Sequence, residues 1–117
     1  MSMPSERPFN PSPLATFYVA NATSASAAAV LSDDAEQVVL YNSSSTAIAY
    51  FTCRNINLTT DTGPTAVVPT TANPGIGAFP VPPGAQIRIT VGYGHKKFSV
   101  IASAADGNLY ITPGKGN

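Results

Sequence analysis

The residues with reactive side chains are few and widely spaced in this chain. It contains one cysteine and one histidine, Cys53 and His95. A Cys–His nucleophile pair needs both side chains within hydrogen-bond reach and a third group that orients the base. No motif beside either residue supports such a pair, and His95 falls in an expected turn between Gly94 and Lys96. We therefore interpret His95 as a surface residue and Cys53 as a small hydrophobic residue near a strand end.

Metal and phosphate chemistry also lack support in the sequence. Zinc takes about four His, Cys, Asp or Glu ligands, and the chain does not place these residue types at ligand spacing. Asp33, Asp34 and Glu36 lack the alternating spacing and the glycine of an EF-hand loop, so a solvated acidic turn is expected. The glycine pairs within residues 74–77 and 92–94 do not join a strand to a phosphate-binding helix. We predict no cofactor, no metal and no enzymatic activity.

The charge of the chain is low and balanced. Six basic and six acidic residues give a net charge of zero, and charged residues are 10% of the 117 residues, against about 25% in typical domains. A hydrophobic content of 44% argues against disorder. Without a basic stripe, binding to nucleic acid or to an anionic membrane has no electrostatic basis. Low charge is typical of a domain partly covered by other protein, or of a small Thr/Ser-rich β domain.

The cysteine content and the first residues bear on where the protein is made. A single cysteine cannot form an intrachain disulfide, whereas small secreted domains usually have several. Residues 1–7 lack the apolar core of a signal peptide, and no apolar run approaches the length of a membrane helix. We therefore expect synthesis in a cytoplasm without export by a standard signal.

Alternating apolar and polar residues predict strands, most clearly in the last third of the chain. Ile87, Ile89 and Val91 alternate with polar residues, and turn residues at 92–94 and 106–108 separate this strand from the next two. The predicted strands are 14–20, 24–31, 37–41, 46–54, 85–91, 97–102 and 108–112. Within residues 55–77 we expect either a short strand around 65–69 or a segment held by a partner, and residues 78–81 are expected to form a short extended piece. Residues 42–45 are predicted as a hairpin-like loop, and residues 82–84 (Pro-Pro-Gly) as a turn. No helix is expected.

This pattern predicts an all-β fold with two antiparallel sheets in a jelly-roll-like sandwich. The sandwich is expected to occupy residues 14–117 as a single domain, which fits the length of the chain. The expected core consists of Val39, Ile48, Tyr50, Ile87, Ile89, Val91, Phe98, Val100, Leu109 and Ile111.

Residues 1–13 are predicted to form an extended arm rather than part of the core. Proline removes backbone donors and favours extended conformations. The candidate interface residues in this arm are Pro4, Pro8, Phe9, Pro11 and Pro13. One interpretation is an arm that lies on a neighbouring subunit; the other is a frayed terminus.

The order of several motifs resembles a known class of protein. A strand that ends in an Asn-Ser turn (residues 38–42) precedes an Ala-aromatic strand (47–51). A Pro-Pro-Gly turn then leads into an amphipathic strand (81–91), followed by a strand that ends in small residues (98–103) and a Leu-Tyr-Ile-Thr-Pro-Gly tail (109–114). Over residues 37–116 this arrangement is similar to the small β-sandwich structural proteins of tailed-phage virions, particularly capsid decoration or cement proteins.

The resemblance implies a jelly-roll-like subunit, often trimeric, that lies outside the capsid and bridges major capsid proteins. The expected partners are therefore the major capsid protein and other copies of the chain, and the expected location is the exterior of the virion. Two alternatives stay open. One is another virion part, such as a head–tail joining protein or a fibre base. The other is a carbohydrate-binding or adhesin-like module that uses exposed tyrosines.

Overall fold

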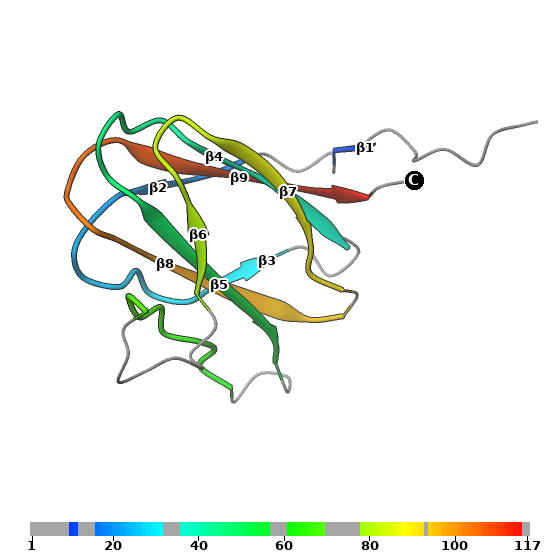
Figure 1. The fold of residues 1–117 in the computed structure, drawn as a ribbon. Coiled ribbons are helices and arrows are strands. Elements are labelled where there is room, and N and C mark those ends of the chain that lie inside the picture. Colours follow the sequence, from blue (N-terminus) through cyan, green and yellow to red (C-terminus); the bar gives the residue numbers. More distant parts are fainter. Residues whose placement is uncertain are drawn as a thin grey trace, which may run out of the picture.

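In the computed structural model, the described part of the chain forms two antiparallel sheets packed face to face (Figure 1). The structure describes residues 10–11, 16–31, 36–56, 61–69, 78–92 and 94–115. Within these ranges there is no helix long and apolar enough to cross a membrane. The strands are β1 (Asn10–Pro11), β2 (Phe17–Ala20), β3 (Ala29–Leu31), β4 (Gln37–Asn42), β5 (Ala49–Asn55), β6 (Phe79–Val81), β7 (Gln86–Thr90), β8 (Lys96–Ala102) and β9 (Asn108–Lys115).

The strand order is that of a jelly roll. In sheet A, β4 lies between β7 and β9, and β1 and β2 both pair with the other side of β9; sheet B has the order β3-β8-β5-β6. The antiparallel pairs β5–β6, β4–β7, β3–β8 and β2–β9 are nested in the sequence. This nested hairpin folds over on itself through the β4–β9 and β5–β8 pairs, which gives the layers β2-β9-β4-β7 and β3-β8-β5-β6. The short strand β1 adds a fifth strand to sheet A. The predicted two-sheet, jelly-roll-like sandwich is confirmed.

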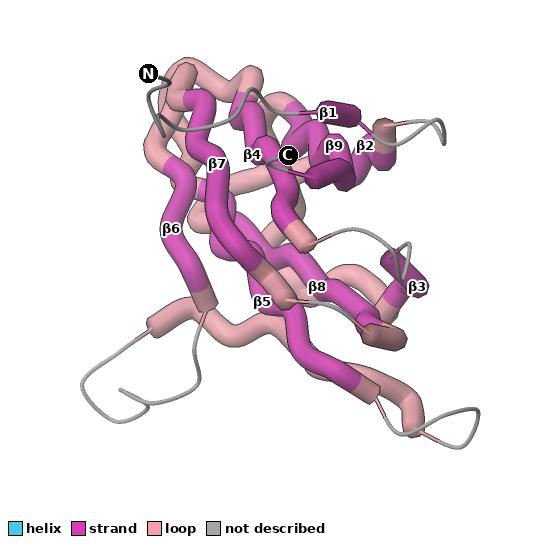
Figure 2. The backbone as a smooth tube through the Cα atoms, turned by 90° about the vertical axis from the view of Figure 1, so that its right-hand side faces the viewer, coloured by secondary structure: helices cyan, strands magenta, loops and turns pink. Residues whose placement is uncertain are grey.

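The predicted loop at residues 42–45 is not a hairpin. It leaves β4 in sheet A and leads to β5 in sheet B, so it crosses between the layers, as the side view in Figure 2 shows. Because only a short loop joins the two strands in the sequence, they are expected to pair as a hairpin. Instead, β4 takes β7 and β9 as neighbours, because the nested pairing of the roll places sequence-adjacent strands in opposite sheets.

The predicted strand at residues 65–69 is also wrong. Residues 61–69 contain no strand and follow the outer side of sheet B, below β5 and β8 in Figure 1. Hydrogen bonds with side chains of the sheet hold this segment in place without the backbone hydrogen bonds of a strand pair. The other predicted strands are present in the described residues, with ends shifted by a few positions.

The core lies between the sheets and differs in part from the expected set. Phe98, Val100, Leu109 and Ile111 are buried as predicted, and the apolar residues of β7 are partly buried against them. The prediction is wrong for Val39, Ile48 and Tyr50, which are only half-buried. The neighbouring residues of opposite parity point inward instead: Val38, Leu40, Ala49 and Phe51. Both faces of β4 and β5 carry apolar residues, so alternation did not identify the inner one.

The predicted Pro-Pro-Gly turn is confirmed. The Ala85 amide donates to the Pro82 carbonyl over 3.1 Å, and Gly84 has φ of 72°. These are the features of a type II turn, in which proline fits the second position and glycine supplies the positive φ of the third. The turn carries the chain from edge strand β6 in sheet B to edge strand β7 in sheet A.

Part of the predicted arm pairs with its own domain. Asn10 and Pro11 lie opposite Lys115 and Gly114, at the end of β9 where Figure 1 shows β1 beside the last strand. β2 pairs with an earlier part of β9, from Asn108 to Ile111. Residues 1–9 and 12–13 lie outside the described ranges, so four of the candidate interface residues, Pro4, Pro8, Phe9 and Pro13, are not placed.

Candidate functional site

The outer face of sheet A is the most distinctive surface of the described structure. Alternate residues of β2, β9, β4 and β7 point away from the core and form this face. Their side chains are tyrosine, threonine, glutamine, asparagine, alanine and valine, and Arg88 is the one charged residue among these described positions. Hydroxyl and amide groups pair along the face: the Thr16 and Thr112 Oγ1 atoms are 3.0 Å apart.

Three tyrosines lie next to one another across this face; we call Tyr18, Tyr41 and Tyr110 the tyrosine row. Tyr110 of β9 is the register partner of both Tyr18 in β2 and Tyr41 in β4. The Tyr18 and Tyr110 rings meet edge to face with centroids 5.7 Å apart, and the Tyr41 and Tyr110 rings stack at 6.0 Å. Tyr18 is 61% exposed and Tyr41 is 40% exposed. The row therefore presents a continuous aromatic surface on a sheet face whose described positions include one charged residue, Arg88.

The outer face of sheet B is covered by the chain itself. Thr52 and Ser99 point away from the core, yet their exposed fractions are only 8% and 0%. The Ala66 amide donates to the Ser99 Oγ over 3.0 Å, and Ser99 donates to the Ser26 carbonyl over 2.8 Å. Residues 61–69 and the stretch before β3 thus shield this face. The two sheets differ: the outer face of sheet B is covered, whereas Tyr18 and Tyr41 on the outer face of sheet A stay exposed in the described part of the chain.

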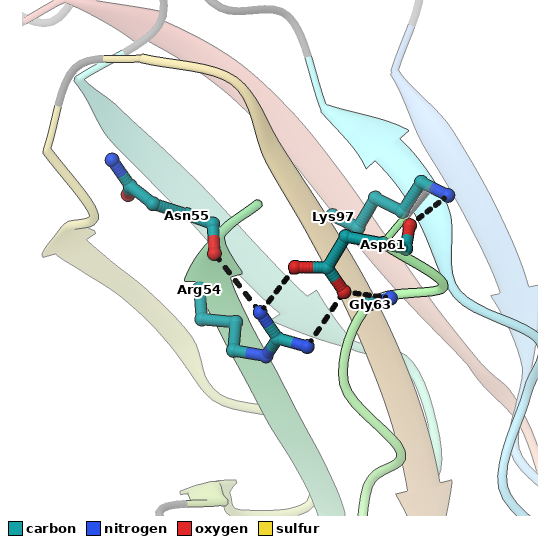
Figure 3. Close-up of polar contacts among 5 residues, drawn as sticks. All are labelled: Arg54, Asn55, Asp61, Gly63 and Lys97. Atoms are coloured by element: carbon teal, nitrogen blue, oxygen red, sulfur yellow. Dashed lines mark hydrogen bonds and ion pairs between the residues drawn. The ribbon is translucent and has the colours of Figure 1, made fainter. Parts of the chain in front are cut away.

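An ion pair fixes the start of the covering segment (Figure 3). Arg54 in β5 makes a two-pronged contact with Asp61, with both N–O distances 2.9 Å. The Asp61 carboxylate also accepts the Gly63 amide at 2.9 Å, and its backbone carbonyl accepts Lys97 Nζ at 3.1 Å. Because Arg54 is about half exposed, solvent screens the pair and its contribution to stability is small. Its role is to define where the segment lies.

A buried polar network ties together the loops at one end of the sandwich. Asn42 is fully buried, and its Nδ2 donates to the Ala47 and Val81 carbonyls over 2.9 and 3.0 Å. Its Oδ1 accepts the Ser44 amide at 3.0 Å and Asn21 Nδ2 at 3.1 Å. All four bonding positions of the Asn42 amide are filled, so one side chain joins both sheets. The local sequence indicates only that Asn42 begins a loop.

Asp106 extends this network at the surface. Its carboxylate accepts the Ser44 hydroxyl at 2.6 Å and the Thr46 hydroxyl at 3.0 Å. These hydrogen bonds to the charged form lower the pKa of Asp106. The next residue, Gly107, has φ of 75°, and a Cβ added there would lie 2.6 Å from the Ser44 backbone. Asp106 and Gly107 therefore stabilise the loop between β4 and β5.

The structure does not bring Cys53 and His95 together as a catalytic pair. Cys53 packs against the core, and its register partner on β8 is Phe98. His95 is exposed in the turn before β8, where its carbonyl accepts the Ile56 amide at 2.9 Å. Burial raises the pKa of the Cys53 thiol to about 11, although the positive charge of Lys96 opposes this increase. The thiol is thus protonated at neutral pH.

This pKa leads to a testable prediction for Cys53. The thiolate is the form that reacts with alkylating agents. With the pKa raised from 9.0 to about 11, the thiolate fraction at pH 8 falls about 100-fold. Alkylation by iodoacetamide at pH 8, followed by mass spectrometry, should be at least about 100-fold slower in the native protein than in urea. Equal rates in the two states would contradict the buried, protonated thiol.

The predicted acidic turn around Glu36 and the buried Lys96 are two further charged features of the chain. Asp33 and Asp34 lie outside the described ranges, while the Glu36 backbone bonds to Gly114, Val91 and Gly92. Among the described residues, no group of three His, Cys, Asp or Glu could hold a metal ion. Lys96 is fully buried, and its Nζ donates to the Gly94 carbonyl over 2.8 Å. Nothing in the sequence pattern indicated that burial.

The strand patterns favour core or rim packing for the tyrosines, whereas Tyr18 and Tyr41 of the tyrosine row are exposed. The members of the row come from three strands that are far apart in the sequence, and only the β2-β9-β4 pairing makes them neighbours. The alternation within each strand does contain a signal. Tyr18 stands between Phe17 and Val19, and Tyr110 between Leu109 and Ile111, so each tyrosine must point to the side opposite its apolar neighbours. Comparison of the chain with protein-family models, with curated proteins and with solved structures finds no match.

Proposed function

We propose that this chain is a non-enzymatic structural subunit of a virion that decorates and stabilises a phage capsid. In this role it bridges major capsid proteins on the capsid exterior as a homo-oligomer, with a trimer favoured. The observation that carries the proposal is the exposed outer face of sheet A with its tyrosine row, where Arg88 is the one charged residue among the described positions. The motif order over residues 37–116 supports the choice of a virion, and jelly rolls recur among viral capsid proteins.

The composition of the open face suits a protein partner. Interface centres are enriched in tyrosine and arginine and depleted in lysine, glutamate and aspartate. The face has three tyrosines and Arg88, with no acidic residue or lysine among its described positions. Hydroxyl and amide groups beside the rings can form hydrogen bonds across an interface. A stable contact of this kind should bury more than about 1,000 Å² in total.

Sedimentation with capsids tests the proposal. Purified protein should pellet with undecorated capsids of the same virus at micromolar concentration and stay in solution without them. Because the face is nearly uncharged, an increase from about 0.1 to 1 M salt should change the binding only slightly, although it shortens the screening length to about 3 Å. Strong loss of binding in salt would point to a charged contact surface elsewhere.

A carbohydrate-binding module is the second candidate, and the tyrosine row itself favours it. Aromatic rings side by side on an exposed sheet can also serve as a platform for sugar rings. A glycan array separates the two functions, since a structural subunit needs no glycan. Specific glycan binding together with a failure to pellet with capsids would overturn the virion proposal.

A further inference from the structure

The tyrosine row is suited to one chemical class of peptide, namely proline-rich segments. Aromatic-lined surfaces bind such segments by packing rings against proline, and tyrosine hydroxyls can donate to the unpaired carbonyls of the peptide. A proline-rich segment also loses little conformational entropy when it binds, because its backbone is already restricted. Tyr18 and Tyr41, the more exposed members of the row, offer the rings that such a partner requires.

This chain carries a segment of that class at its own N-terminus. Residues 1–9 read Met-Ser-Met-Pro-Ser-Glu-Arg-Pro-Phe and include Pro4, Pro8 and Phe9. The six residues from Pro4 to Phe9 can span about 19 Å when extended, at roughly 3.1 Å per residue. Adjacent strands are about 4.8 Å apart, so the three strands of the row cover about 10 Å between their axes. The segment is therefore long enough to cross the row.

Strand β1, which follows this segment in the chain, runs away from the tyrosine row of its own subunit toward its N-terminal end. From Pro11 to Asn10 the register moves from Gly114 to Lys115, which is away from Tyr110 on β9. Tyr110 is five positions before Lys115 in β9, a distance of about 17 Å at roughly 3.4 Å per residue. The direction of β1 therefore favours the tyrosine row of a second copy over the row of the same copy as the receptor.

We propose that residues 4–9 of one copy bind the tyrosine row of a second copy. This inference rests on one part of the proposed function, the assembly of the chain with itself, and it names the segment and the face that make the contact. The contact is head-to-tail: each copy uses its N-terminal segment as the ligand and its sheet A as the receptor. Such a heterologous contact closes into a ring when the rotation permits, as in a trimer.

A complementation experiment with two variants tests the contact. One variant lacks residues 1–9 but keeps Asn10 and Pro11, so β1 can still pair with β9. The other carries Tyr18→Ser and Tyr41→Ser. Light scattering after size-exclusion chromatography should show that the parent assembles and that neither variant does so alone. An equimolar mixture should form a 1:1 complex, because one variant supplies the receptor face and the other the ligand segment.

A direct binding measurement and a matched control complete the design. A labelled peptide of residues 1–9 should bind the truncated protein, and Tyr18→Ser with Tyr41→Ser should weaken it about tenfold or more. A peptide with alanine at both proline positions should bind equally weakly. The control is Val30→Ser, since Val30 is 60% exposed, like Tyr18, but lies on edge strand β3 of sheet B. It should leave both assembly and peptide binding unchanged.

Three outcomes would overturn the inference. Peptide binding that survives the tyrosine changes would place the receptor site elsewhere, and a mixture that stays monomeric would exclude exchange between copies. A glycan that binds the parent but not the tyrosine variant, with the peptide unbound, would assign the row to sugar. The capsid sedimentation experiment tests the virion role independently of this contact. If copies assemble through the tyrosine row but do not pellet with capsids, the virion role is refuted and the contact between copies is still supported.

Discussion

Replacement of Asn42 by alanine should lower the free energy of unfolding by at least about 3 kcal/mol, because three buried partners lose a hydrogen bond and each loss costs about 1–3 kcal/mol. The change leaves the Ala47 and Val81 carbonyls and the Ser44 amide without the bonds that Asn42 makes at 2.9–3.0 Å. Whole domains are stable by only about 5–15 kcal/mol. Urea unfolding followed by circular dichroism measures the loss.

Ser43→Ala is the matched control for Asn42. Ser43 is the next residue, and its hydroxyl also makes two hydrogen bonds, with the Asn108 carbonyl at 3.2 Å and the Asn108 amide at 3.0 Å. Ser43 is exposed, however, so water can replace these bonds, and the cost should stay below about 1 kcal/mol. Equal losses from the two substitutions would show that the Asn42 network does not join the sheets.

The sequence was sufficient to predict the fold class. In the last third of the chain, one face of each strand is apolar and turn residues separate the strands, so alternation identified Phe98, Val100, Leu109 and Ile111 as core. The Pro82-Pro83-Gly84 turn was also readable, because its residue types match the backbone angles of a type II turn. Local patterns therefore determine local geometry well in this chain.

The same reasoning failed where both faces of a strand are apolar. In β4, Val38 and Leu40 oppose Val39 and Tyr41, and alternation cannot tell which pair points inward. Asn42 shares the parity of Val38 and Leu40 and is buried with them. Its burial depends in part on the Val81 carbonyl and the Asn21 amide, which are distant in the sequence, so no local pattern shows it.

The candidate site was beyond local prediction for a similar reason. A tyrosine in a strand is compatible with core, rim or surface positions, and only the pairing of three strands creates a row. The covering of sheet B by residues 61–69 has no periodic signal either, because it depends on single contacts such as Ala66 with Ser99. Long-range pairing, rather than residue type, decides which outer face stays open.

Phe98→Ala should destabilise the fold by about 3–5 kcal/mol, the usual cost of removing a buried aromatic ring. Phe98 is 1% exposed and lies at the centre of the contact between the two layers. Its ring stacks at 5.9 Å on Phe51 of the same sheet and meets the edge of Phe17, from sheet A, at 5.1 Å. Differential scanning calorimetry or urea unfolding measures the loss.

A double-mutant cycle between Phe17 and Phe98 isolates the contact between sheets. If the sandwich packs through this pair, the two alanine substitutions should be non-additive by about 0.5–1.5 kcal/mol, the range for aromatic pairs at such distances. Ile89→Ala is the reference, since Ile89 is only partly buried in edge strand β7 and should cost about 1–2 kcal/mol. Additivity of the Phe17 and Phe98 changes, with a cost for Phe98 no larger than that for Ile89, would mean that the two sheets do not meet through these rings.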